Sequence, residues 1–185
     1  MRELPPGLTI RHTTEADLAD VARLWADPEV MRWVGYPGGL RLTDEELRRW
    51  LAWAEESPDR RHFVVSDDEI GFCGELFSAV DRGTGRAALD VKLLPAARGR
   101  GVATAALRWL VDLVFESEPD VELVWTEPWP ENEAAMRLYA RCGLRPGPRP
   151  GDLAPGPSFW ARARADPEPD ERTIRSTERT IRSTR

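Results

Sequence analysis

The amino-acid sequence predicts an α+β domain in which helices flank a mixed central β-sheet. Three observations on the order of its patterns point to this class. Helical patterns crowd the N-terminal third, strand patterns joined by short turns fill the middle, and strand–helix units come late. The 185 residues suffice for one domain, and a hydrophobic content of 41% can form a sizeable core.

One strand and two amphipathic helices are expected in the N-terminal third. Residues 8–12 form the strand pattern, and Thr14 is a candidate N-cap for a helix over 15–25. Apolar residues recur at helical spacing within that helix. An apolar, glycine-rich connection over 29–39 follows. The segment Thr43-Asp-Glu-Glu46 matches a capping box, which marks the start of the second helix.

Further strands are expected in the middle and late parts of the chain, where apolar runs alternate with turns rich in Gly and Asp. In chain order these strands are 61–66, 70–80, 87–94, 121–126 and 159–163. A long apolar helical pattern over 104–115 lies between the third and the fourth of them. Hairpin connections first and a strand–helix–strand unit later indicate a mixed sheet.

The C-terminal end differs in character from the rest. We assign residues 1–165 to the folded domain and 166–185 to a low-complexity tail. The tail begins with an acidic, proline-bearing stretch, and the sequence Glu-Arg-Thr-Ile-Arg-Ser-Thr then occurs twice, at 171–177 and 178–184. This repeat has too little apolar content to fold alone. It predicts a disordered extension or a duplication, with a basic interaction tail as the functional alternative.

Composition argues against several function classes. A net charge of −6 and a pI near 5.1 argue against a nucleic-acid-binding surface. Cys73 and Cys142 fit no metal-ligand spacing, so we expect two buried thiols and no metal. No apolar stretch approaches the ~20 residues of a membrane span, and the first residues do not resemble a signal peptide. A cytoplasmic protein without a membrane partner is therefore expected.

The segment Arg98-Gly99-Arg100-Gly101-Val102-Ala103 joins a predicted strand to a predicted helix. Glycines let a backbone approach an anion closely, the first N–H groups of a helix have no intrahelical partner, and arginines add charged donors. The arrangement favours phosphate binding. It lacks the ending of a P-loop and the spacing of a dinucleotide motif, and a plain glycine turn is the structural alternative.

A second motif follows at a distance that leaves room for one helix and one strand. Trp125-Thr-Glu-Pro-Trp-Pro-Glu-Asn132 leads into a helical pattern that contains Tyr139 and ends at Gly143. With the glycine loop, this resembles the Gcn5-related N-acetyltransferases (GNAT), over roughly residues 8–164. The resemblance implies a GNAT-type acyl-CoA N-acyltransferase fold and acetyl-CoA as co-substrate. It extends to aminoglycoside 6′-N-acetyltransferases and to ribosomal-protein N-acetyltransferases.

The resemblance also implies a cofactor site. Residues 98–103 would hold the pyrophosphate, and the main-chain groups of Val91, Lys92 and Leu93 would pair with the pantetheine amides as a strand does. A main-chain N–H there could also stabilise the oxyanion. Asn132 would bond the pantetheine arm, although Asn is equally suited to cap the following helix.

Tyr139 and Asp90 are the candidate catalytic residues. A phenol with a reference pKa near 10 stays protonated at neutral pH, so Tyr139 can donate a proton to the leaving thiolate. Asp90 interrupts an apolar strand, which is costly for a carboxylate without a role or a partner. It could take the amine's proton, anchor an ammonium group, or pair with Lys92. Glu127 is the rival base, and a solvated strand end is its structural alternative.

The acceptor stays open between two classes: a small-molecule amine, such as an aminoglycoside-like polycation, and a peptide N-terminus. A non-catalytic acyl-CoA-binding module is a third alternative. Three tryptophans, Trp33, Trp125 and Trp129, are expected near the acceptor cleft, where they either line it or serve the structure. The oligomeric state is not fixed by the sequence, and a homodimer stays open.

Overall fold

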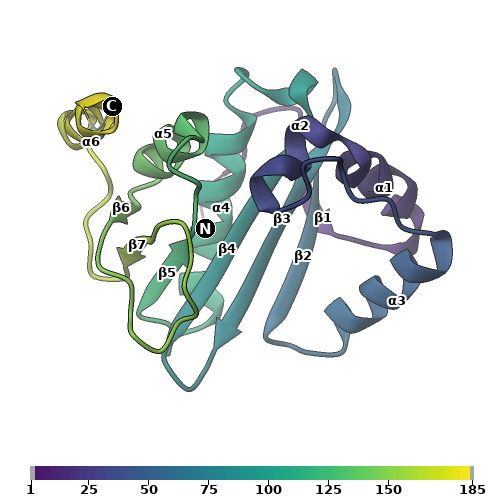
Figure 1. Ribbon diagram of the computed structural model, residues 1–185, viewed down its shortest axis with the longest axis horizontal. Helices are drawn as coiled ribbons and strands as arrows, with labels where there is room; N and C mark the ends of the chain where they lie inside the picture. The colour runs from purple at the N-terminus through teal and green to yellow at the C-terminus, as the bar shows by residue number, and fades with distance from the viewer. Residues whose placement is uncertain (1–2, 184–185) are drawn as a thin grey trace.

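A seven-stranded mixed sheet in the order β1-β2-β3-β4-β5-β7-β6 forms the centre of the computed structural model, which describes residues 3–183 (Figure 1). The strands are β1 (Leu8–His12), β2 (Arg60–Asp67), β3 (Gly71–Asp81), β4 (Arg86–Leu93), β5 (Leu123–Thr126), β6 (Arg145–Pro146) and β7 (Trp160–Ala163). Only the β4–β5 pair is parallel among these described strands. The α+β class and the mixed sheet are confirmed.

Helices cover both faces of the sheet, with α1, α2 and α3 on one side and α4 and α5 on the other (Figure 1). They are α1 (Leu18–Ala26), α2 (Pro28–Met31), α3 (Asp44–Glu55), α4 (Val102–Ser117), α5 (Glu133–Arg141) and α6 (Glu171–Ser183). Short 3-10 turns occur at Glu15–Asp17, Arg32–Val34 and Pro95–Ala97. Each face therefore has its own apolar core, the larger one beneath α4.

Local capping chemistry sets where the N-terminal helices begin. The predicted capping box is present: Glu46 N donates to Thr43 Oγ1 at 3.3 Å, and Thr43 N donates to Glu46 Oε2 at 2.7 Å. The connection predicted over 29–39 instead opens with α2, because Pro28 suits a first helical position and Asp27 accepts from Glu29 N at 2.8 Å. Sequence pattern alone missed this single-turn helix.

Strands β4 and β5 part after a short contact. Arg86–Ala88 pair with Leu123–Trp125, and the described part of the chain shows no further pairing between these two strands. On its other side β4 stays paired with β3 along its whole length. The edge of β4 from Leu89 onward is consequently free of β5, and this opening positions the site described below.

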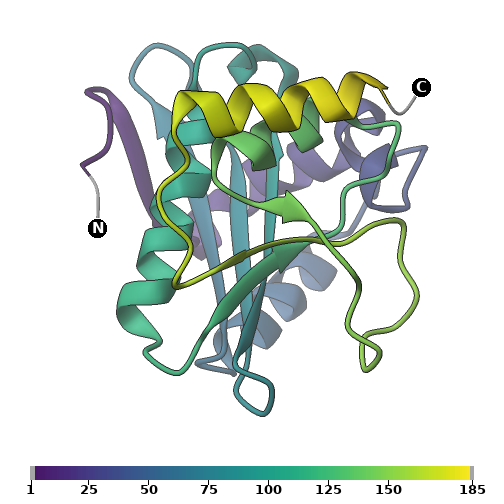
Figure 2. The same cartoon turned by 90° about the vertical axis from the view of Figure 1, so that its left-hand side faces the viewer.

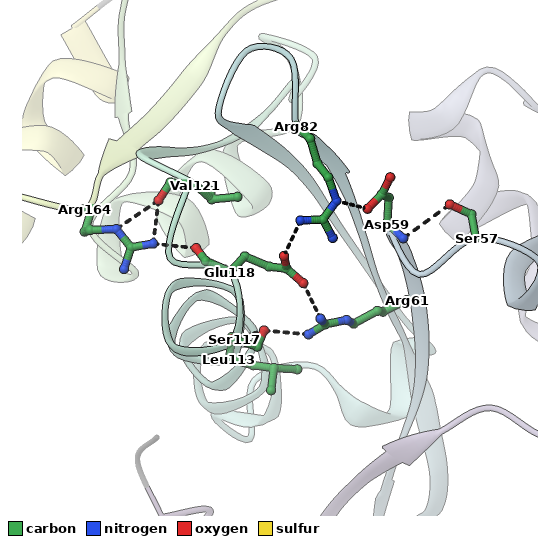
Figure 3. A network of polar contacts seen from close by, with 9 residues as sticks. All are labelled: Ser57, Asp59, Arg61, Arg82, Leu113, Ser117, Glu118, Val121 and Arg164. Atoms are coloured by element: carbon green, nitrogen blue, oxygen red, sulfur yellow. Dashed lines mark hydrogen bonds and ion pairs between the residues drawn. The ribbon is translucent and has the colours of Figure 1, made fainter.

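An ionic network ties the end of α4 to the sheet (Figure 3). Glu118, 5% exposed, pairs with Arg61 of β2 and lies 3.1 Å from Nη1 of Arg82, which follows β3. The carbonyl oxygen of Glu118 accepts from Arg164 Nη2 at 2.7 Å. Arg82 Nε donates in turn to Asp59 at 2.6 Å. The buried carboxylate of Glu118 thus has partly exposed arginine partners, and these contacts hold the end of α4 against β2 and the residues that follow β3 and β7.

The tail predicted as a disordered extension is helical from Glu171 to Ser183 and lies along α5 (Figure 2). Its seven-residue repeat places Ile174 and Ile181 two turns apart on one face, and Ile181 is buried. Glu178 pairs with Arg141 of α5 at 3.0 Å. Packing against α5 therefore stabilises a helix that the apolar content of the repeat could not stabilise alone. Residues 1–2 and 184–185, the outer ends of the predicted domain and tail, lie outside the described residues.

Candidate active site

A cleft of about 630 Å³ opens where β4 and β5 part. Its lining comes from the free part of β4, the loop that follows it, the first turns of α4, and α5. The turn after α2 and the segment Thr126–Trp129 close its other side. Segments far apart in the chain therefore meet at this one opening.

The glycine loop forms one end of the cleft. Gly99 and Gly101 have φ values of +76° and +83°, a region that favours glycine, and no atom lies within 4 Å of a Cβ built on either. Gly101 caps α4 without any side-chain hydrogen bond to the helix. The N–H groups of Val102, Ala103 and Thr104 have no carbonyl partner within the helix and lie at the positive end of a 16-residue helix. This geometry suits a phosphate.

The two arginines of the loop differ in position. Arg98 lines the cleft and pairs with Glu29 of α2. Arg100 pairs with Glu69, in the turn between β2 and β3, away from the cleft lining. The sequence predicted both arginines at the phosphate, and of the two only Arg98 lines the cleft. Both of these ion pairs are exposed, so an anionic ligand can compete for either arginine.

The free edge of β4 presents Val91, Lys92 and Leu93 to the cleft, as the pantetheine prediction requires. One detail bears on the predicted oxyanion role. The N–H of Val91 donates to Asp90 Oδ1 at 2.8 Å, so an oxyanion role for this group would require the carboxylate to move. The side chain of Lys92, which that prediction does not involve, ion-pairs with Glu75 and Asp90.

Helix α5 carries the two residues of the second motif. Asn132 caps the helix, its Oδ1 accepting from Ala135 N at 3.1 Å. The Asn132 amide nitrogen makes no hydrogen bond within residues 3–183, so one side chain can serve both the cap and a ligand. Seven residues later Tyr139 lines the cleft from the same helix face, 6% exposed.

The environment of Tyr139 keeps its phenol protonated. Burial, followed by the negative charge of Asp90, raises the pKa of Tyr139 well above the usual value, and a hydrogen bond with Thr126 only partly offsets this. The phenol therefore stays protonated throughout the neutral range. Its predicted role as an acid is compatible with this geometry.

The Asp90 carboxylate meets the structural alternative, and its position in the cleft leaves its two catalytic roles open. It pairs with Lys92, as the structural alternative required, and it lines the cleft with a side chain that is 35% exposed. Glu127 also lines the cleft but is bound by Arg149, which further donates to the Ser158 carbonyl at 2.6 Å. Glu127 and Asp90 are therefore alike in that each carboxylate is ion-paired, with side chains 32% and 35% exposed.

Of the three tryptophans predicted near the cleft, two line it and one packs elsewhere. Trp33 and Trp129 line the cleft, and Trp129 is 44% exposed. Trp125 instead stacks on Phe159 with ring centroids 5.6 Å apart, which is a structural role. Sequence spacing placed all three near the cleft but could not tell which faced it.

Two residues of the site escaped the sequence analysis, Glu75 of β3 and His62 of β2. Glu75 is 1% exposed and His62 is 6% exposed. A signal existed for Glu75, since it is a lone carboxylate inside an apolar strand, as Asp90 is. Within residues 3–183 no group of three or more potential ligands could hold a metal ion. The same part of the chain contains no helix long and apolar enough to cross a membrane.

Comparison with known proteins gives a consistent picture. A family model described as "Acetyltransferase (GNAT) domain" matches residues 7–145. Aminoglycoside N(6′)-acetyltransferase type 1 of Klebsiella pneumoniae is 26% identical over 149 residues, which cover 75% of this chain and 74% of the relative.

Among solved structures, spermidine N-acetyltransferase from Vibrio cholerae, in complex with CoA and spermine, aligns with a TM-score of 0.73 at 18% identity. The match covers 87% of this chain and 98% of that one. A ribosomal L7/L12 α-N-protein acetyltransferase in complex with coenzyme A gives a TM-score of 0.70 at 14% identity, covering 87% and 96%. At these identities the likeness concerns the fold.

Proposed function

This chain belongs to the GNAT family of N-acetyltransferase enzymes, and on that premise we propose that it moves an acetyl group from acetyl-CoA to a primary amine in the β4–β5 cleft. One observation carries the proposal. The cleft joins an anion-binding helix start at one end to Asp90 and Tyr139 at the other. A ligand with a phosphate-bearing end and a reactive thioester end requires that combination.

The residues present fit acetyl-CoA as co-substrate. Gly99 and Gly101 leave open space that any Cβ would narrow, and Arg98 can turn from Glu29 to a pyrophosphate. The unpaired edge of β4 offers strand-like hydrogen bonds to the amides of pantetheine. The amide nitrogen of Asn132 is a further donor toward that arm.

The transfer follows from the placement of Asp90 and Tyr139. An acceptor arrives as an ammonium ion, and Asp90 attracts it and accepts one proton, directly or through water. The neutral nitrogen attacks the thioester carbonyl carbon, and a main-chain N–H of β4 stabilises the oxygen as charge develops. The C–S bond then breaks, and Tyr139 gives its proton to the departing thiolate. The acylated nitrogen still carries one surplus proton, which returns through water to the Tyr139 phenolate and leaves a neutral amide and the CoA thiol. No covalent enzyme intermediate is needed.

For the acceptor we propose a small polycationic amine. The cleft lining includes the carboxylate of Glu131 and the aromatic side chain of Trp129, 44% exposed, beside the ion-paired carboxylates of Asp90 and Glu127. Cationic groups are attracted by both kinds of surface. The relatives named for aminoglycosides and spermidine agree with this chemistry. A peptide N-terminus is the alternative acceptor class, and a homodimer remains a prediction.

A panel of acceptors tests the proposal. The purified protein is incubated with acetyl-CoA and, separately, kanamycin, spermidine and a peptide with a free N-terminus, and both free thiol and the acetylated product are measured. We expect the polyamines to give equal amounts of thiol and N-acetyl product. Turnover of the peptide alone would move the assignment to the alternative class. Tight CoA binding with no product from any amine would indicate a non-catalytic module.

A further inference from the structure

Beside the cleft a chain of buried polar groups lies on one face of the sheet. Glu75 lies at its centre, 1% exposed, on the β3 residue directly opposite Lys92 of β4. Its Oε1 accepts from Lys92 Nζ at 2.9 Å, and both of its oxygens accept from Trp25 Nε1, at 3.0 and 2.9 Å. His62 Nε2 lies 3.1 Å from Oε2, without the alignment for a hydrogen bond.

Lys92 connects this buried carboxylate to the cleft. Its ammonium group lies between two carboxylates, Glu75 behind it and Asp90 in front. Asp90 and Lys92 are two residues apart on β4, so they project from the same face of the sheet. Glu75, as the cross-strand partner of Lys92, projects from that face as well.

The burial of Glu75 determines how its charge must be stabilised. An ionised carboxylate in a dry interior is costly unless a positive charge and hydrogen bonds accompany it. Glu75 has both, and its attraction to Lys92 and His62 outweighs burial, so that the pKa of its carboxyl is lowered to about 2. Lys92 is correspondingly held charged. Two negative charges therefore share one buried ammonium group.

We propose that Glu75 is a positioning residue for the acetyl transfer, acting through Lys92 to orient the Asp90 carboxylate and to set how tightly it holds a proton. The inference rests on the proposed function of Asp90 as base. With Glu75 present, Lys92 is divided between two carboxylates and cannot fully neutralise Asp90. Glu75 also fixes the ammonium group, so that Asp90 keeps one oxygen toward Lys92 and its exposed edge toward the acceptor.

A purely structural role for Glu75 predicts something different. Its bonds to Trp25 and Lys92 would then only hold α1 and β4 on β3, and its removal would lower stability without changing catalysis at the cleft. The proton affinity of Asp90 depends on all charges that face it. Lys92 from β4 pairs with Asp90, and Glu75 from β3 lies on the other side of Lys92. Tyr139 and Arg137 from α5, and Arg32 and Glu127 from the flanking loops, share the cleft lining with Asp90.

Among these groups Glu75 and Lys92 act on Asp90 with opposite sign. Replacing Glu75 by Gln leaves the ammonium group to Asp90 alone, so the acidic limb of the kcat/KM profile should move to lower pH. Replacing Lys92 by Met removes the positive charge and should move that limb to higher pH. Lys92 contacts Asp90 directly and Glu75 acts from beyond it, so at an effective dielectric of about 20 we expect a shift of about one pH unit for Glu75→Gln and a larger one for Lys92→Met. Opposite displacements are not expected from loss of stability.

The test measures kcat and KM for the best acceptor from pH 5 to 9 in the wild type, Glu75→Gln and Lys92→Met, each below its melting temperature. Glu118→Gln is the matched control, since it removes another buried carboxylate with an arginine partner but lies away from the cleft. We expect kcat to fall about tenfold in both test variants, the limbs to move in opposite directions, and CoA affinity to stay unchanged.

The outcomes separate this inference from the function on which it rests. An active wild type whose acid limb stays in place in both variants, with only the melting temperature lowered, would overturn the positioning role and leave the acetyltransferase assignment intact. The same is true if Glu118→Gln moves the limb as far as Glu75→Gln does. A wild type without transfer to any amine would refute the proposed function itself, independently of Glu75.

Discussion

A negative charge placed in the first turn of α4 should separate cofactor binding from stability. Thr104 lines the cleft one turn from Gly101, and the first turn of α4 contains no acidic residue. Thr104→Glu brings a carboxylate to the N–H groups that we assign to the pyrophosphate. Gly101→Asp would be a poorer choice, because its φ of +83° strains any other residue and mixes a backbone effect into the result.

The expected magnitude follows from the position of the new charge. Two unit charges about 6 Å apart interact by about 3 kcal/mol at an effective dielectric of about 20, and salt reduces this at an exposed site to about 1–2 kcal/mol. CoA affinity should therefore fall roughly tenfold or slightly more. A carboxylate at a helix start is itself favourable by about 0.3–1 kcal/mol, so the melting temperature should hold or rise slightly.

Titration calorimetry with CoA, together with thermal unfolding, measures both quantities. Thr104→Gln is the matched control, since it has the same shape as Glu without the charge, and it should bind CoA within about twofold of the wild type. Equal CoA affinity in Thr104→Glu and Thr104→Gln would show that the pyrophosphate binds elsewhere. A large drop in the melting temperature of Thr104→Glu would refute the electrostatic reasoning about the helix start.

Three further predictions concern the proton donor Tyr139, the ion pair between Glu29 and Arg98, and the contribution of Glu118 to stability. Tyr139→Phe should lower kcat by about 10²–10⁴, and a kcat within twofold of the wild type, with chemistry rate-limiting, would exclude the role. The wild type itself should lose no activity on the alkaline side below pH 9, because the raised pKa of Tyr139 keeps the phenol protonated. Glu29→Gln should raise CoA affinity by up to about fivefold, measured by calorimetry, because it frees Arg98; unchanged affinity would mean that Arg98 does not reach the phosphate. Glu118→Ala should lower the free energy of unfolding by about 2–3 kcal/mol and Tm by about 4–12 °C, since Arg61 loses its buried partner; a Tm within 1 °C would show that the network of Figure 3 contributes little.

The sequence was sufficient for the fold class and for most strands, because period and turn chemistry are local signals. The capping box at Thr43, the glycine loop at 98–103 and the spacing of Asn132 and Tyr139 all appear where expected. The tail was misjudged for a physical reason. Whether the repeat forms a helix depends on the α5 surface against which Ile181 packs, and the composition of the repeat contains no information about that surface.

The site likewise contains residues that the local sequence could identify and contacts that only tertiary packing creates. Asp90 and Tyr139 could be singled out because each is unusual in its own element. Their meeting across the β4–β5 opening, and the pinning of Glu127 by Arg149, depend on how elements pack. The cross-strand pair of Glu75 and Lys92 was also hidden, since register joins residues 17 positions apart only after folding. The candidate catalytic residues could therefore be predicted from the amino-acid sequence, whereas the side chains that they contact are known only from the structure.

The most direct measurement of the central claim compares the wild type with Asp90→Asn in steady-state kinetics across pH, using the best acceptor of the panel. Asn keeps the shape of Asp90 and can still accept from Val91 N, but it cannot take a proton. The account predicts a fall in kcat of about 10²-fold or more, with CoA affinity unchanged. A rise in KM with kcat preserved would reduce Asp90 to an anchor for the ammonium group. Unchanged kcat and KM would contradict the account and move the base to Glu127 or to an ordered water.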